Sequence, residues 1–242
     1  MKPLSMKHAF FAFLVFCMTG LAAQAQEWTP DASASKRDLS GFHGIDVSNG
    51  IVLVLIASDK EEVYVSASDN EYRDKISTTV EGGVLTIKYS IQINKHKKEE
   101  RNLKAWVYYK QLDMLTVSTG ALLKWQNELK AASMKIKANT GAIVNGAVDI
   151  ADLDVNQDTG SIITLTGTAI KLSVQGDTGS IFKGADLTTQ NCSATASTGA
   201  GVYITVNKEL NVKANTGGFI KYKGEGGIRE VKTHTGGRVS RI

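Results

Sequence analysis

Cysteine and proline are nearly missing from this sequence. The 242 residues contain two cysteines, Cys17 and Cys192, and two prolines, Pro3 and Pro30. Cys17 lies in a segment that we expect to be removed, so Cys192 stays single and no intramolecular disulfide can form. Cys192 occupies a position that leucine holds in other copies of a repeat, which predicts a small core residue. Because both prolines precede Asp38, no linker-like break follows, and residues 38–242 are expected to form one domain.

The chain also lacks a strong excess of one charge. It has 28 basic and 24 acidic residues, and without Lys2 and Lys7 the remaining 26 basic residues leave a net charge of +2. This balance argues against a dedicated nucleic-acid binder. His43, His96 and His234 show no metal-ligand spacing. Phosphate loops and the common hydrolase motifs are missing as well, so we assign no catalytic and no cofactor-binding residue.

A long hydrophobic run occurs only at the N-terminus. Residues 9–21 are apolar but too short to cross a bilayer, and Lys2 and Lys7 precede them. Ala23-Gln24-Ala25 has the small-x-small pattern of a cleavage site. We therefore expect a signal peptide at 1–25 and a polar leader at 26–37. The bulky Phe16 disfavours lipoprotein processing at Cys17. The predicted location is the periplasm, the outer-membrane surface or the extracellular space, with no transmembrane segment after signal removal.

A short motif containing Thr-Gly occurs seven times from residue 118 onward. The intervals between the repeated glycines are 21, 19, 19, 20, 18 and 19 residues. A period of this size is typical of a solenoid in which each repeat forms one coil. The glycines are Gly120, Gly141, Gly160, Gly179, Gly199, Gly217 and Gly236. We expect them to be structural turn residues with left-handed backbone.

The residues around each Thr-Gly pair indicate β-structure. Apolar residues stand four and six positions before the threonine, for example Val155 and Leu153, or Val174 and Leu172. A spacing of two is the strand period. A second apolar position follows two residues after the glycine. We predict an all-β, single-domain parallel β-helix or β-solenoid with rungs of about 19 residues, and favour a right-handed coil. Val155, Val174 and Val212 are expected to point inward.

The N-terminal third has an irregular β pattern. Ser48-Asn49-Gly50-Ile51 is similar to the repeated turn, and Glu81-Gly82-Gly83 predicts a hairpin. The charged run Lys95–Arg101 is expected to be a solvated loop. Four aromatic residues could cover the seam with the first regular coil or form a sugar-stacking platform, and we favour the seam. They are Trp106, Tyr108, Tyr109 and Trp125.

The segment 42–53, Val84-Leu85-Thr86-Ile87 and the Thr-Gly turns together resemble the secreted head GIN domain family. The likeness covers essentially all of residues 38–242. Members of this family are described as candidate autotransporter adhesins, and their biochemical activity is unknown. The resemblance implies a parallel β-helix-like body and a role at the cell envelope or surface. It implies no catalytic residues.

Asp158 and Asp177 hold the same position in adjacent repeats, so their carboxylates should lie near each other. Paired carboxylates can bind Ca²⁺ or act as acid and base on glycosides. The same position holds Ser118, Asn139 or His234 in other copies, as expected if only a turn-forming residue is required. We therefore keep Asp158 and Asp177 as weak metal candidates and assign no cofactor other than a potential Ca²⁺.

Two classes of function remain open. The first is a structural, adhesive or ligand-binding envelope protein that presents a ladder surface to a cell-surface glycan or an envelope protein. The alternative is a carbohydrate-active enzyme, either a polysaccharide lyase or a hydrolase, on a β-helix scaffold. The first class is favoured, so we expect a non-enzymatic protein. Arg238 and Arg241 on the last rung should discourage edge pairing, which predicts a monomer or a weak dimer.

Overall fold

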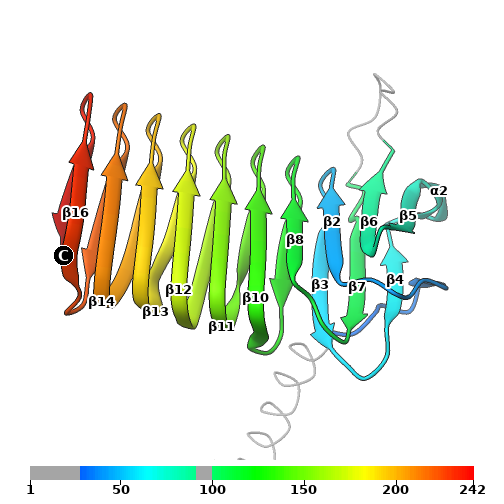
Figure 1. Cartoon of the computed structure of the whole chain (residues 1–242). Helices are drawn as coiled ribbons and strands as arrows, with labels where there is room; N and C mark the ends of the chain where they lie inside the picture. Colours follow the sequence, from blue (N-terminus) through cyan, green and yellow to red (C-terminus); the bar gives the residue numbers. More distant parts are fainter. Residues whose placement is uncertain (1–27, 91–99) are drawn as a thin grey trace, which may run out of the picture.

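The computed structural model describes residues 28–90 and 100–242, which form a stack of β-strand coils (Figure 1). In this described part of the chain, seventeen strands join in one continuous sheet that winds around a common core. The stack grows from the N-terminal part, at the right of Figure 1, to the C-terminus at the left. The predicted all-β solenoid with rungs of about 19 residues is confirmed.

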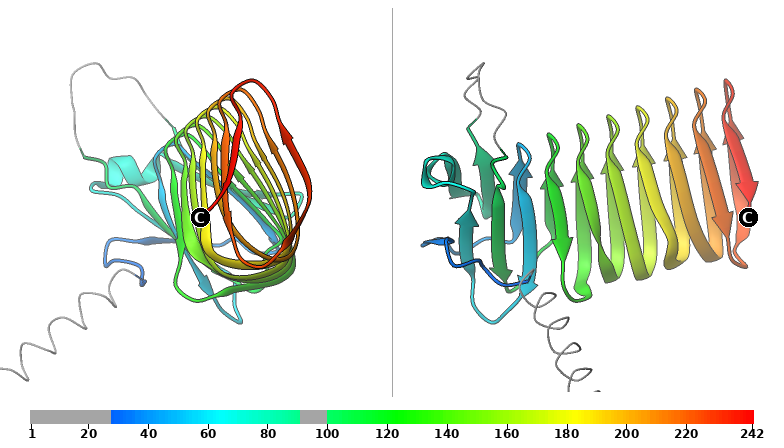
Figure 2. Two further views of the ribbon diagram at one scale, coloured as in Figure 1. Left: turned by 90° about the vertical axis from the view of Figure 1, so that its left-hand side faces the viewer. Right: turned by 180° about the vertical axis from the view of Figure 1, so that it is seen from behind.

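Each regular rung consists of a strand that leads into a Thr-Gly turn and a strand that leaves it. Long strands run from one turn around the opposite bend to the next turn (Figure 2). We call the side before the turns the pre-turn face and the side after them the post-turn face. The strands are β8 (Met114–Val117), β9 (Leu122–Trp125), β10 (Leu129–Ala138), β11 (Ile143–Gln157), β12 (Ile162–Gly176), β13 (Ile181–Ala196), β14 (Gly201–Ala214), β15 (Phe219–Lys223), β16 (Gly227–Thr233) and β17 (Arg238–Arg241).

Parallel pairing places equivalent residues of successive rungs side by side. Val155 of β11 pairs with Val174 of β12, and Val174 pairs with Ala194 of β13. Register shifts occur within the β12–β13 and β13–β14 pairs, where the repeat departs from 19 residues. The Thr189 hydroxyl donates to the Thr205 carbonyl at 2.7 Å, so a buried polar group at this irregularity is satisfied. Parallel pairing therefore continues on both sides of each register shift, although the repeat length varies slightly.

The N-terminal third inserts strands out of sequence order. β2 (Gly44–Ser48) and β3 (Val52–Ala57) pair in parallel with β8 and β9, and β6 and β7 lie on their other side. Asn49 and Gly50 have φ values of 63° and 75°, so the predicted early copy of the turn is confirmed. The remaining strands are β1 (Ser35–Arg37), β4 (Glu62–Ser66), β5 (Ile76–Glu81), β6 (Val84–Tyr89) and β7 (Lys104–Tyr109).

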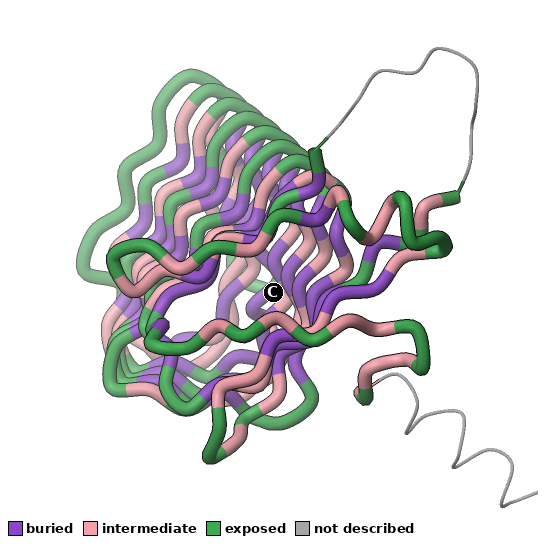
Figure 3. The backbone as a smooth tube through the Cα atoms, turned by 90° about the vertical axis from the view of Figure 1, so that its right-hand side faces the viewer, coloured by how far each residue is buried: buried purple, intermediate pink, exposed green. Residues whose placement is uncertain are grey.

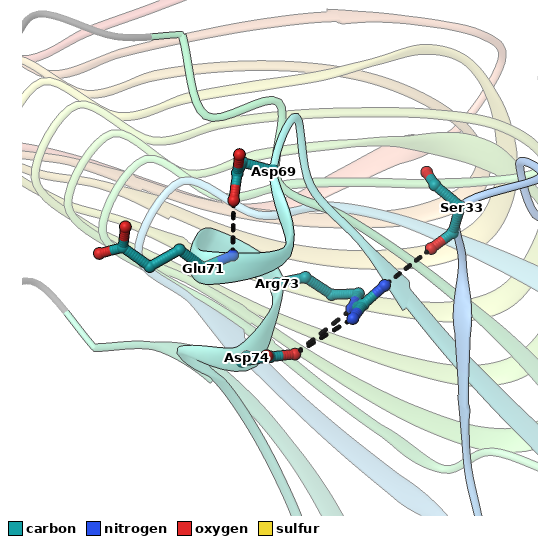
Figure 4. A network of polar contacts seen from close by, with 5 residues as sticks. All are labelled: Ser33, Asp69, Glu71, Arg73 and Asp74. Atoms are coloured by element: carbon teal, nitrogen blue, oxygen red, sulfur yellow. Dashed lines mark hydrogen bonds and ion pairs between the residues drawn. The ribbon is translucent and has the colours of Figure 1, made fainter.

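Antiparallel strands and one short helix close the N-terminal end. β5 and β6 form the predicted hairpin, whereas β4 pairs with β7 and with β1. In helix α2 (Asn70–Asp74), the Asp69 carboxylate accepts the Glu71 N–H at 2.7 Å and caps the N-terminus. Arg73 of this helix donates to the Ser33 carbonyl at 3.4 Å (Figure 4). The last residues of the predicted leader are thus part of the folded body.

The hydrophobic core runs inside the coil from Phe42 to Ile220, and buried positions recur from coil to coil (Figure 3). Val155, Val174 and Val212 are at most 3% exposed, which confirms their inward orientation. Cys192 is buried among them, and burial raises the pKa of its thiol to about 12. Val231, which pairs with Val212 from the last rung of the structure, is 46% exposed.

The turns have left-handed backbone at two successive residues. The seven repeated glycines have φ between 68° and 77°, as predicted, and each preceding threonine also has positive φ, between 40° and 51°. The Ser180 N–H donates to the Asp177 carbonyl at 3.0 Å across one such turn. This geometry is that of a type I′ turn. The residue before the threonine lies outside the positive-φ region.

Three of the four aromatic residues at the predicted seam are buried. Trp106, Tyr109 and Trp125 are at most 7% exposed, and the Trp125 indole N–H donates to the Ala147 carbonyl at 2.6 Å. Tyr108 packs edge-to-face on Tyr64. Because these rings are used for packing, the arrangement favours the seam over a sugar-stacking platform.

The predicted signal peptide and Lys95–Glu99 of the charged run lie outside the described residues. Arg101, at the end of that run, lies over the Tyr72 and Tyr89 rings. Within residues 28–90 and 100–242, no helix is long and apolar enough to cross a membrane.

Candidate functional site

A polar groove follows the edge where the pre-turn face meets the turns. It has a volume of about 480 Å³ and extends over the rungs from β8 to β13. We call it the turn groove. Its lining residues are Thr116, Val117, Ser118, Lys137, Ala138, Asn139, Asn156, Gln157, Asp158, Gln175, Gly176, Asp177, Thr195 and Ser197.

The groove is built by two rows of equivalent residues. The first row projects from the last outward position of each pre-turn strand, and Asn156 and Gln175 stand side by side in it. The second row is the residue immediately before each threonine, which includes Asn139 and Asp158. Since neighbouring strands are about 4.8 Å apart, each row offers hydrogen-bonding groups at that interval. Amides, hydroxyls and carboxylates in such rows suit an extended ligand with regularly spaced hydroxyl groups.

Asp158 and Asp177, which hold the same position in adjacent repeats, both line this groove. Each carboxylate accepts the N–H of the following threonine, at 2.6 Å for Asp158 and 2.7 Å for Asp177. The Thr178 hydroxyl and the Thr159 N–H hold the pKa of Asp158 below its usual value. The two side chains therefore stabilise their own turns, and Asp158 is kept ionised. No group of three or more His, Cys, Asp or Glu suited to a metal occurs in the described part of the chain.

Asp158 lacks the raised pKa that a general acid needs in glycoside hydrolysis. A general acid needs a carboxyl whose pKa is raised, usually by burial in an apolar pocket. The pKa of Asp158 is shifted in the opposite direction. Of the histidines singled out above, His43 contacts Asp113 at 2.8 Å on the exposed surface, and His234 lies in the last turn. His96 falls outside the described residues.

The second apolar position of the repeat faces outward, which our sequence analysis did not anticipate. Ile162 and Ile181 pair side by side on the post-turn face and are half-buried, whereas Ser161 and Ile163 point into the core. The strand period of two would have predicted this orientation. If Val155 points inward, every second residue from it points inward too, which includes Gln157, Ser161 and Ile163 but not Ile162.

Comparison with known families identifies the relatives of this chain. Residues 41–226 match the family described as "Putative auto-transporter adhesin, head GIN domain". The chain belongs to this family. The matched region includes the turn groove and ends before β16, so the last rung lies beyond it. No curated protein matches the sequence.

Crystal structures of other proteins share the fold of this head GIN domain. A candidate adhesin from Bacteroides fragilis has a TM-score of 0.77 at 18% identity and covers 88% of this chain and 99% of its own. One from Parabacteroides merdae has a TM-score of 0.69 at 16% identity, with coverage of 87% and 95%. One from Parabacteroides distasonis has a TM-score of 0.65 at 18% identity, with coverage of 86% and 96%. At these identities the likeness concerns the fold alone.

Proposed function

We propose that this head GIN domain is an adhesive protein of the bacterial surface that binds a linear glycan in the turn groove. Membership of an adhesin family indicates a binding role and an extracellular or surface location. The predicted signal peptide at 1–25 would provide export. The glycan itself is our inference from the chemistry of the groove.

The observation that carries the proposal is the regular pair of polar rows in the groove. Sugar hydroxyls both donate and accept hydrogen bonds, and the Asn156 and Gln175 amides can do the same. Asp158 adds an ionised acceptor, and hydrogen bonds to charged groups are stronger than neutral ones. A linear glycan lying across the rungs would meet similar partners at each step, so affinity would grow with chain length.

A glycan array probed with residues 26–242 tests this function. We expect signals from linear glycans that strengthen with chain length. Asn156→Ala together with Gln175→Ala should weaken these signals at least about tenfold, because each lost hydrogen bond contributes roughly 1 kcal/mol. Asn191→Ala together with Asn211→Ala is the matched control, since these amides lie on the same face outside the groove.

Two outcomes of the array would contradict the proposal. An array without any glycan signal, or equal losses in the groove variant and the control, would remove the turn groove as the binding site. Turnover of a bound glycan would favour the alternative of a carbohydrate-active enzyme. A rise in thermal stability that requires both Ca²⁺ and Asp158 and Asp177 would add a metal to this site.

A further inference from the structure

A row of outward-facing apolar side chains lies along the post-turn face, on the side of the rungs away from the turn groove. It occupies the second residue after each turn glycine, and its members are half-buried. We call it the aliphatic stripe. Its residues are Leu122, Ile143, Ile162, Ile181 and Phe219.

The stripe is continuous although glycine occupies one of its positions. Gly201 stands between Ile181 and Phe219 in the register. A Cβ atom added at Gly201 would lie 2.4 Å from the Phe219 ring, so the ring lies over this glycine and fills the gap. The stripe therefore crosses six rungs, which correspond to roughly 24 Å at the usual strand spacing. Inward packing does not require this row, because the adjacent residues already fill the core.

Basic and aromatic side chains flank the stripe. The neighbouring outward row includes Lys124, Lys183 and Lys221, and neither row contains a carboxylate from Leu122 to Ser240. Lys124 lies 5.4 Å from the Trp28 ring, and Lys221 lies 5.7 Å from the Tyr203 ring.

The C-terminal end of the post-turn face also combines aromatic rings with cations. Tyr203 and Phe219 form an edge-to-face pair with ring centroids 5.7 Å apart. Together with Lys221, Arg238 and Ser240 they line a hollow of about 460 Å³. The hollow thus combines two aromatic rings with two cations.

The pre-turn face differs in its charge. There, opposite charges alternate along the rungs, as in the Lys135–Asp154 pair at 3.6 Å and the Arg229–Glu209 pair at 2.5 Å. Such paired charges are common on a surface that faces water. On the post-turn face, the aliphatic stripe and the row beside it instead combine cations with apolar side chains and contain no carboxylate, whereas Asp186 lies further from the turns and pairs with Lys223 at 3.8 Å. Cations beside a line of apolar side chains are the composition of surfaces that bind anionic membranes.

We propose that the post-turn face docks on an anionic phospholipid surface. The aliphatic stripe and the aromatic rings would enter the boundary between headgroups and acyl chains, where Trp, Tyr and Phe are favoured. The lysines and Arg238 would attract phosphate groups. A second copy of the chain fits this face poorly, because the two sets of cations would repel each other. The inference does not rest on glycan binding, since the turn groove lies on the other face.

Sedimentation with lipid vesicles tests the proposal directly. Residues 26–242 are used, because an uncleaved apolar signal segment would itself bind lipid. We expect binding to vesicles of equal parts phosphatidylglycerol and phosphatidylcholine, and little binding to phosphatidylcholine alone. Binding should weaken as salt is added, because exposed charges are screened. Lys183→Glu with Lys221→Glu should lower the affinity for anionic vesicles at least about tenfold.

Two further variants separate the apolar and the electrostatic contributions. Ile162→Ser with Ile181→Ser should also reduce binding, although the lysines remain. Lys171→Glu with Lys213→Glu makes the same change of charge on exposed positions of the pre-turn face and should leave binding intact. Circular dichroism of each variant confirms that the solenoid is folded.

Several results would overturn the proposal. These are a lack of binding to anionic vesicles, equal binding to both vesicle types, or equal losses in the Lys171/Lys213 control. Another is a dimer that the Ile162/Ile181 variant dissociates while vesicles stay unbound, because the face would then be an interface between copies. Binding of soluble polygalacturonate, but not vesicles, through the same lysines would replace the lipid by an acidic glycan.

Discussion

At the scale of single residues, the threonine of each turn is the least expected feature. A β-branched residue with positive φ is energetically unfavourable, yet seven such threonines recur. Each turn is bonded to the next, as where the Gly160 N–H donates to the Thr178 carbonyl at 3.0 Å. The Thr178 hydroxyl also stabilises the Asp158 carboxylate of the preceding rung. These contacts between rungs offset the local strain, which a single repeat taken alone does not show.

The turn glycine gives the first prediction. Gly179→Ala should lower the free energy of unfolding by about 1 kcal/mol or more, because its φ of 70° is strained for alanine. Gly227→Ala is the control, since Gly227 has no positive φ and its nearest neighbour leaves ordinary space. Urea unfolding measures the free energy of unfolding of both variants. Equal stabilities of the two variants would contradict the role of the left-handed turn.

A charge placed in the core gives the second prediction. Val174→Asp should destabilise the protein by about 3 kcal/mol or more, because the carboxylate would be buried without a partner. Gln175→Asp places the same charge on the next, exposed residue and should have little effect. Thermal unfolding compares the two. An unchanged midpoint in Val174→Asp would refute the inward orientation.

The lowered pKa of Asp158 gives the third prediction. A carboxyl with a lower pKa in the folded state adds stability above the usual value of 3.8, and this contribution is lost as pH falls through the folded value. Asp158→Asn should therefore reduce stability at neutral pH and flatten the loss in acid. Asparagine suits the site, since Asn139 and Asn215 hold it in other rungs. Acid unfolding curves that coincide with those of the unmodified protein would argue against this.

At the scale of elements, the strands and turns of the regular rungs could be predicted from the sequence, whereas the strand order of the N-terminal third could not. Val155, Leu153 and their counterparts repeat at fixed distance from the turn, so strand, turn and inward row follow from one copy. The order β6–β2–β8 depends on pairing between distant segments without a repeat. The turn groove was not predicted: the sequence singled out only Asp158 and Asp177, as a carboxylate pair, because the other lining residues are ordinary polar side chains. The aliphatic stripe could have been predicted from the sequence, because strict alternation of inward and outward residues along the strand places Ile162 on the outer surface.

The last rung gives the fourth prediction. β16 is exposed throughout, and Ile228, Val231 and Ile242 are 46% to 60% exposed. Arg238 and Arg241 on this rung should keep other chains away by charge repulsion, so the protein should be mainly monomeric. Arg238→Thr with Arg241→Thr should promote association, measured by light scattering. Lys171→Thr with Lys213→Thr, the matched control on the pre-turn face, should not. A large oligomer of the unmodified protein would disprove the prediction.

At the scale of the whole molecule, the solenoid separates two surfaces of different chemistry. The turn groove offers rows of amides, hydroxyls and carboxylates, whereas the post-turn face offers apolar side chains beside cations. Both arise from the same repeat, because each outward position of a rung becomes a row in the stack. In the two proposals above, the post-turn face would lie on a lipid surface while the turn groove binds a glycan.

The central claim is that the turn groove binds a linear glycan, and an NMR titration tests it most directly. Isotope-labelled residues 26–242 would be titrated with the glycan that gives the strongest array signal. We predict that the side-chain amides of Asn139, Asn156 and Gln175 shift together, with little change at Asn191 and Asn211. Shifts confined to residues outside the groove, or none at saturating glycan, would contradict the claim.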